Sequence, residues 1–210
     1  MKGNYKAIVF DIDGTLIDTE KAVLISLQHT FYRMFHILKK EEDLYFVLGI
    51  PGKMALRNMG ITEDQIPEAL EQWDRYYGWY SYSSSVFEGI EKVIQDLKLA
   101  GKKTGIVTSK TREEYVTDCY TFPILKIFKN VICSDDVRNP KPAADSLLKC
   151  MKDMEVMPEE TLYIGDAIYD YQCACAADVD FALAGWGCKM PDQIDAKYKM
   201  EVPEKILEIV

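Results

Sequence analysis

The stretch Lys6-Ala7-Ile8-Val9-Phe10-Asp11-Ile12-Asp13-Gly14-Thr15 decides the fold. Its first half is apolar and rich in residues that favour strands, which is typical of a buried strand in a parallel sheet. It then changes abruptly to two acids and a glycine, a composition typical of a loop. We therefore expect a buried strand that delivers two carboxylates to the edge of a sheet.

The C-terminal part of the chain alternates between helix and strand patterns. This alternation predicts an α/β fold with a parallel sheet, helices on both faces and right-handed crossovers. Helices are expected over residues 90–99, 112–120, 143–154 and 169–177, and strands over 103–107, 131–133, 162–164 and 180–184.

Residues 18–85 have a different, helical character. Apolar residues recur at helical spacing over 19–38, Gly49-Ile50-Pro51-Gly52 interrupts the pattern, and an aromatic-rich helix is expected over 68–80. We therefore predict one domain formed by residues 1–17 and 86–210, with residues 18–85 inserted as a second, helical domain.

Composition narrows the class of protein. The chain has 210 residues, of which 48% are hydrophobic, so it can bury a sizeable core. It shows neither a signal-peptide pattern nor an apolar run long enough to span a bilayer, so we expect a cytoplasmic protein with no membrane partner. Six scattered cysteines predict reduced thiols rather than a disulfide framework. A net charge of −9 disfavours nucleic acid as a partner.

The acids after the first strand are candidates for chemistry. Asp11 and Asp13 can point to the same side in extended backbone, and Gly14 permits a sharp turn whose amides could face a phosphate. Paired carboxylates repel each other, and a hard cation such as Mg²⁺ compensates for this. One carboxylate could then act as a nucleophile. An acidic turn that caps the next helix is the alternative interpretation.

Polar residues also follow three later strands, at the edge where parallel sheets bind ligands. Thr108 and Ser109 could donate hydrogen bonds to a phosphate, or could cap the next helix. Lys141 lies between two prolines and could neutralise a phosphoryl group, although loop lysines are usually solvated. Asp166 could complete a metal site, and Asp170 could hold either a metal-bound water or Lys141. Each signal is weak alone, but their joint occurrence in this order is a strong indication of a phosphate site.

These four motifs, in this order, resemble the signature of the haloacid dehalogenase-like (HAD) hydrolase superfamily, and the resemblance covers essentially the full chain. Residues 11–19, 87–90, 105–110 and 134–142 are similar to the phosphoglycolate phosphatase and bacterial pyrophosphatase branch. The resemblance implies a Rossmann-like HAD core with a small α-helical cap domain. It also implies a Mg²⁺-dependent phosphatase that acts on a small phosphorylated metabolite, such as phosphoglycolate or pyrophosphate, as a monomer or homodimer.

The resemblance further implies residue roles. Asp11 would be the nucleophile, and Asp13 would be first the general acid and then the general base. Mg²⁺ would be held by Asp11, the backbone carbonyl of Asp13 and Asp166, with Asp170 completing the metal site. The phosphoryl group would be bound by Thr108 and Lys141, assisted by Gly14 and Ser109.

Substrate choice is expected to depend on residues 48–53, which are similar to the family's specificity loop. Gly49 and Lys53 are the candidates there, and an exposed lysine at a helix start is an equally good interpretation of Lys53. A dehalogenase is disfavoured by Asp13, and a phosphosugar mutase by the absence of a histidine near Val23. A phosphonatase that uses Lys53 stays open, as does a non-catalytic binding protein on the same fold.

Overall fold

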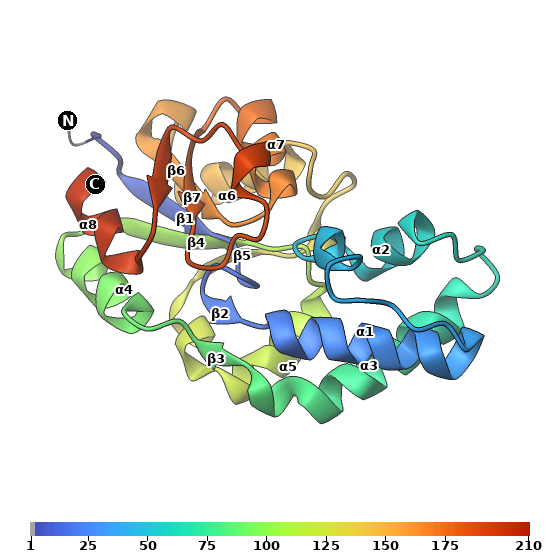
Figure 1. Ribbon diagram of the computed structural model, residues 1–210. Helices are drawn as coiled ribbons and strands as arrows, with labels where there is room; N and C mark the ends of the chain where they lie inside the picture. The colour runs from blue at the N-terminus through green and yellow to red at the C-terminus, as the bar shows by residue number, and fades with distance from the viewer. Residues whose placement is uncertain (1–2) are drawn as a thin grey trace.

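The computed structural model describes residues 3–210 and contains a six-stranded parallel sheet (Figure 1). The strand order is β5-β4-β1-β6-β7-β8, which places β1 centrally between β4 and β6. Central parallel strands are covered on both faces, which explains the unbroken apolar run in β1. The α/β class with a parallel sheet is therefore confirmed. The strands are β1 (Ala7–Phe10), β4 (Lys103–Val107), β5 (Asn130–Ile132), β6 (Thr161–Gly165), β7 (Asp180–Ala184) and β8 (Tyr198–Met200).

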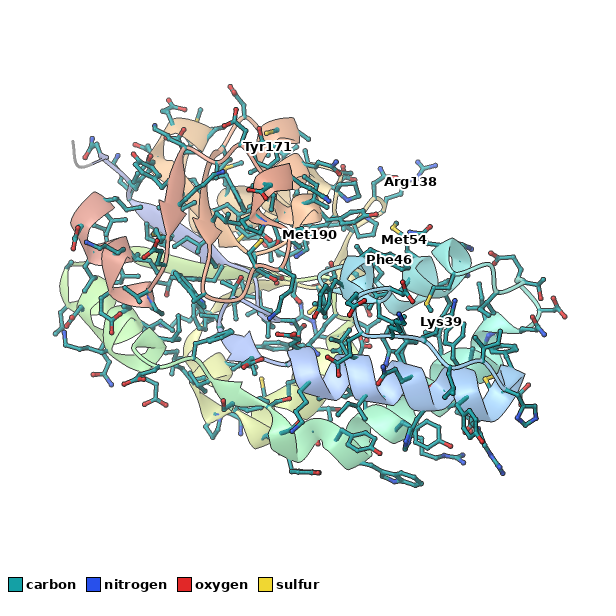
Figure 2. All side chains as sticks on the ribbon, in the orientation of Figure 1. Lys39, Phe46, Met54, Arg138, Tyr171 and Met190 are labelled. Atoms are coloured by element: carbon teal, nitrogen blue, oxygen red, sulfur yellow. The ribbon has the colours of Figure 1, made fainter. Side chains whose placement is uncertain are left out.

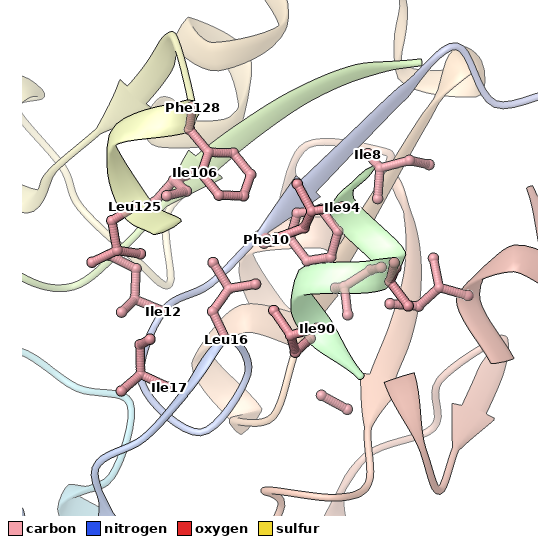
Figure 3. Close-up of a cluster of buried hydrophobic side chains, with 14 of the residues drawn as sticks. Ile8, Phe10, Ile12, Leu16, Ile17, Ile90, Ile94, Ile106, Leu125 and Phe128 are labelled. Atoms are coloured by element: carbon pink, nitrogen blue, oxygen red, sulfur yellow. The ribbon is translucent and has the colours of Figure 1, made fainter. Parts of the chain in front are cut away.

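Alternate residues of β1 pack into two separate hydrophobic layers. Ile8 and Phe10 belong to the layer under helices α4, α5 and α8, and Figure 3 shows them beside Ile90 and Ile94 of α4. Ala7 and Val9 point into the opposite layer, under α6 and α7. The sheet with these two layers is called the α/β core below. The helices are α4 (Ile90–Leu99), α5 (Arg112–Thr121), α6 (Asp145–Met154), α7 (Ile168–Ala176) and α8 (Ile206–Ile209).

A helical insertion, residues 20–83, leaves the core after β2 (Ile17–Asp18) and returns through β3 (Ser85–Val86). These two short strands pair antiparallel with each other, and the chain enters and leaves the insertion through them. The insertion contains α1 (Glu20–Phe35), α2 (Gly52–Asn58) and α3 (Ile66–Tyr80), with α1 and α3 side by side in Figure 1. It has a hydrophobic cluster of its own, and the indole of Trp73 donates to Ser26 Oγ (2.9 Å) inside that cluster.

The structure differs from the sequence prediction at several element ends. The first insertion helix stops at Phe35, three residues before the predicted end at Leu38, because His36 adopts the left-handed conformation (φ 54°). The short elements β8 and α8 were not predicted. Brief 3₁₀ turns complete the chain at Tyr45–Val47, Ser81–Ser83, Pro123–Ile127, Ser134–Asp136, Pro158–Glu160, Pro191–Gln193 and Pro203–Lys205.

The structure also bears on the cysteines and on membrane spans. All six cysteines are free thiols, as predicted. Within residues 3–210, the helices are too short or too polar for any of them to cross a bilayer.

Candidate active site

The loop after β1 is a tight turn that fixes the position of Asp11. Asp11 is almost fully buried, and its amide donates to the carbonyl of Ile164 on β6 (2.9 Å). The carbonyl of Ile12 then accepts from three successive amides, those of residues 15–17, which closes the loop on itself. The nucleophile candidate is therefore held by the rigid central strands rather than by a mobile loop.

Gly14 is required for steric reasons. Its φ of +77° is unfavourable for other residues, and a Cβ there would lie 2.2 Å from Asp166 Oδ2. Its amide donates to the Ile17 carbonyl (2.8 Å), so the predicted phosphate contact through this amide is not supported by the geometry. Gly14 instead allows the β1 loop to approach Asp166, and the Thr15 hydroxyl donates to Asp166 Oδ1 (3.2 Å).

Lys141 links the first and last motifs. Its side chain is fully buried, and Nζ donates to Asp11 Oδ1 (2.7 Å) and to Asp170 Oδ1 (2.6 Å). Burial alone would lower the pKa of Lys141, but the two carboxylates outweigh this effect and raise it. Lys141 is therefore a permanent cation beside the nucleophile candidate.

Asp170 holds Lys141 in place. Its Oδ2 accepts from the Ala167 amide (3.1 Å) at the start of α7, and its Oδ1 accepts from the hydroxyl of Tyr163 (2.8 Å) as well as from Lys141. Of the two roles weighed for Asp170, the structure shows the contact with Lys141. Tyr163 was not predicted, because a tyrosine inside an apolar strand looks like an ordinary core residue.

Three buried carboxylates gather at this edge of the sheet. One oxygen each from Asp11, Asp166 and Asp170 lies within 4.8 Å of the others. With Lys141 counted, the cluster carries a formal charge of −2 when all three acids are ionised. Burial raises the pKa of Asp11 to about 7 despite Lys141, and burial with the neighbouring acids raises that of Asp166 well above its usual value. A divalent cation with oxygen ligands fits both the donor set and the uncompensated charge.

The end of β4 brings Thr108 and Ser109 to the same edge. Thr108 is buried, and its Oγ1 accepts from the Lys110 amide (3.2 Å). Ser109 Oγ donates to the carbonyl of Gly49 in the insertion (2.9 Å). Ser109, predicted to bind phosphate, thus joins the α/β core to the insertion in this structure.

Asp13 contacts Lys110, a residue for which no role was predicted. Lys110 Nζ lies 3.3 Å from Asp13 Oδ1 and 3.0 Å from Asp118 Oδ2. The pattern of acids and hydroxyls after strands does not single out Lys110 or Asp118. The fold alone brings them together.

The insertion covers the site through the loop around Gly49. Gly49 (φ +82°) packs so closely on the core that a Cβ there would lie 2.4 Å from Ala167 Cβ. A small crevice between insertion and core is lined by Phe46 from one side and by Met190 and Asp166 from the other, and Figure 2 labels the first two. Lys53, in contrast, is 56% exposed, and its ammonium group lies 4.0 Å from Glu63.

The geometry thus brings most of the predicted site residues together. Asp11, Lys141, Asp166 and Asp170 form one buried cluster. Asp13, Gly14, Thr108 and Ser109 lie on the loops that adjoin it. Gly49 reaches these loops from the insertion, whereas the observed contact of Lys53 is with a surface acid.

Comparisons with known proteins agree with this arrangement. The sequence pattern of haloacid dehalogenase-like hydrolases matches residues 8–184. Pyrophosphatase PpaX of Halalkalibacterium halodurans is 28% identical over 211 residues, covering 97% of this chain and 95% of the relative. Pyrophosphatase PpaX of Bacillus anthracis is 27% identical over 183 residues, covering 87% and 84%. A Lactobacillus plantarum structure assigned provisionally as a phosphoglycolate phosphatase has a TM-score of 0.90 at 26% identity, covering 100% of both chains.

The protein belongs to the haloacid dehalogenase-like hydrolases. It is an enzyme of the phosphatase branch of that family, which confirms the resemblance seen in the four motifs.

Proposed function

We propose that the protein is a Mg²⁺-dependent phosphatase that transfers the phosphoryl group of a small metabolite to Asp11 and then to water. The observation that carries this proposal is the buried cluster in which Lys141 Nζ lies 2.7 Å from Asp11 Oδ1 while Asp166 and Asp170 leave a formal charge of −2. Such a cluster neutralises its charge by binding a divalent cation, and it holds one carboxylate ready for attack.

Asp11, Asp166 and the backbone carbonyl of Asp13 would hold the Mg²⁺ ion, with Asp170 as a further candidate. When bound, Mg²⁺ supplies charge stabilisation for the phosphoryl oxygens. Asp11, whose pKa burial raises, would be ionised at neutral pH when the ion and the ammonium group of Lys141 both lie beside it.

The first step transfers the phosphoryl group to the enzyme. A carboxylate oxygen of Asp11 attacks phosphorus, the bond from phosphorus to the leaving oxygen breaks, and Asp13 gives its proton to that oxygen. Lys141 and Thr108 bind the phosphoryl oxygens during this transfer. The rigid attachment of Asp11 to β1 and β6 keeps the attacking oxygen in place.

The second step releases phosphate. Asp13, now ionised, takes a proton from water as the water oxygen attacks phosphorus, and the bond from phosphorus to Asp11 breaks. Asp13 thereby regains the proton that it gave up, and Asp11 returns as a carboxylate.

The helical insertion would act as the cap over this site. The pairing of β2 with β3, the Ser109–Gly49 hydrogen bond and the close packing of Gly49 on Ala167 support a closed arrangement in this structure. Opening would admit substrate through the crevice near Phe46, and closure would exclude water during the first step. The pairing of β2 with β3 supports domain boundaries at residues 17/18 and 85/86.

The substrate is proposed to be a compact phosphorylated molecule, because the crevice is small and the site is buried. The names of the relatives, pyrophosphatase and phosphoglycolate phosphatase, make pyrophosphate and phosphoglycolate the first candidates. The exposed Lys53 contacts a surface acid rather than the buried cluster, which gives no support to a phosphonatase that uses it to form a Schiff base.

The test is phosphate release from pyrophosphate, phosphoglycolate, sugar phosphates and p-nitrophenyl phosphate, in Mg²⁺ and in EDTA. Turnover in Mg²⁺ that EDTA abolishes is expected. Asp11→Asn should abolish it, whereas Asp153→Asn, which removes an exposed acid paired with Lys149 on α6, should retain it. Folded protein that releases no phosphate from any of these compounds would contradict the proposal.

A further inference from the structure

Lys110 lies beside Asp13 and contacts residues of both the α/β core and the insertion. It follows β4, and its side chain is only 13% exposed. Its Nζ bridges two carboxylates, Asp13 Oδ1 at 3.3 Å and Asp118 Oδ2 at 3.0 Å. The ring of Tyr77, from α3 of the insertion, lies over the same ammonium group, 5.2 Å from Nζ to the ring centroid.

Asp118 is the second acid that Lys110 contacts. It is a buried acid on α5, and its Oδ2 makes no hydrogen bond with good geometry to the described residues apart from this ion pair. Burial raises the pKa of the Asp118 carboxyl, and Lys110 opposes that effect. Burying a carboxylate is costly without a paired cation, so the fold retains Asp118 and Lys110 as a pair.

The same arrangement occurs at the nucleophile. Asp11 is held by Lys141, and Lys141 is held in turn by Asp170. Asp13 is contacted by Lys110, and Lys110 is contacted by Asp118. The proposed nucleophile Asp11 and the proposed general acid Asp13 therefore each face a lysine that a second, buried acid anchors.

We propose that Lys110 is a positioning residue for Asp13, anchored by Asp118 and covered by Tyr77 of the insertion. The inference rests on the proposed function, in which Asp13 exchanges a proton with the leaving group and with water. A carboxylate can rotate, and the ion pair with Lys110 restrains Asp13 Oδ1, which has no hydrogen-bond partner among the described residues. The other oxygen is then held toward the leaving oxygen, and small errors in such geometry reduce rates strongly.

Tyr77 ties this arrangement to the insertion. Its ring covers the ammonium group only while α3 lies in the position seen here, and a cation over an aromatic face is stabilised. Closure of the insertion thus completes the surroundings of Lys110. The same movement of the insertion would therefore cover the site and position Asp13.

The experiment compares two substrates of similar shape, phenyl phosphate and p-nitrophenyl phosphate. Phenolate is the poorer leaving group, so its departure depends more on a proton from Asp13. Lys110→Met should lower kcat/KM for phenyl phosphate about tenfold more than for p-nitrophenyl phosphate, since general acid catalysis contributes roughly 10²–10⁴-fold. Asp118→Asn should shift the ratio in the same direction by a smaller factor, and Lys110→Arg should restore part of it.

The control is Lys126→Met, because Lys126 also lies over a tyrosine ring (5.3 Å, Tyr120) but is exposed and forms no ion pair with Asp13 or Asp118 in the described part of the chain. It should leave the ratio unchanged. Equal losses on both substrates in Lys110→Met would overturn the inference, because they indicate substrate binding or misfolding, while the proposed function would stand. If Lys110→Met does not fold, the ratio in Asp118→Asn decides. A wild-type protein without Mg²⁺-dependent turnover of either ester would refute the proposed function and this inference together.

Discussion

Replacing Lys141 by methionine would leave two buried carboxylates, those of Asp11 and Asp170, without their paired cation. Methionine has a similar length and fills the same space without a charge. The wild-type ammonium group lies 2.7 Å from Asp11 Oδ1 and 2.6 Å from Asp170 Oδ1, and its side chain is fully buried. No solvent can replace these contacts, so the full cost of the unpaired charges appears in the folding free energy.

The magnitude follows from burial and from pH. Removing one partner of a buried ion pair costs about 3–5 kcal/mol. For a chain of this size, each kcal/mol shifts Tm by roughly 2–4 °C, so Lys141→Met should lower Tm by about 6–20 °C. In the native protein, burial raises the pKa of Asp11 to about 7, whereas the unfolded carboxyl ionises near its usual pKa of about 4. Lys141 opposes this rise, so Asp11 in the folded variant holds its proton more strongly still and avoids an unpaired charge at pH 6. The loss of stability relative to wild type is therefore smaller at pH 6 and grows toward pH 8.

The assay is thermal unfolding followed by circular dichroism, in EDTA, at pH 6 and pH 8. Lys149→Met is the matched control, because Lys149 pairs with Asp153 (3.1 Å) on the exposed face of α6 and such pairs contribute about 0–1 kcal/mol. The double variant Lys141→Met/Asp170→Asn should recover part of the loss. A Tm for Lys141→Met within about 2 °C of wild type at pH 8 would refute this reasoning about the buried cluster.

Three further predictions concern the metal site and the insertion. Gly14→Ala should weaken Mg²⁺ binding more than about tenfold in calorimetry, because the added Cβ would lie 2.2 Å from Asp166 Oδ2. Gly78→Ala is the control and should bind Mg²⁺ normally, because a Cβ there would have no atom within 4 Å. Equal affinities of the two variants would contradict the steric argument. The Mg²⁺ dissociation constant should fall from pH 6 to pH 8, by up to about tenfold per pH unit for each displaced proton, since burial raises the pKa of Asp11 to about 7; an unchanged constant would argue against Asp11 as a ligand. Ser109→Ala should accelerate hydrogen exchange in the loop that accepts its hydrogen bond by roughly fivefold, the equivalent of about 1 kcal/mol, and unchanged exchange would show that this bond does not hold the insertion.

Most of the fold could be predicted because the central strands β1, β4 and β6 carry buried apolar residues and end directly before polar residues. The predicted strand over residues 103–107 agrees with β4 at both ends. Strand β8 was missed because Tyr198–Met200 is a three-residue edge strand with a lysine at its centre, and so short a segment shows no periodicity. The end of α1 was missed because a histidine, rather than a glycine, adopts the left-handed conformation there.

The site could be predicted in part for a similar reason. Asp11 and Asp166 directly follow strands, Lys141 lies in the segment between β5 and α6, and strand ends converge in a parallel sheet. Tyr163 and Asp118 could not be predicted, because one lies inside a strand and the other inside a helix, where their types look structural. Their partners, Asp170 and Lys110, lie nearby in sequence but outside the strand or helix in question, and only the folded chain shows these contacts.

The pairing of β2 with β3 makes the insertion separable in an engineering sense. Ile17 lies opposite Val86 and Asp18 opposite Ser85, so the chain leaves and re-enters the α/β core at neighbouring points. A segment whose ends are adjacent can be exchanged for another of different length without moving the strands that carry the nucleophile. The insertion of a relative could therefore be transplanted at these two positions, which would change what the enzyme accepts while preserving how it reacts.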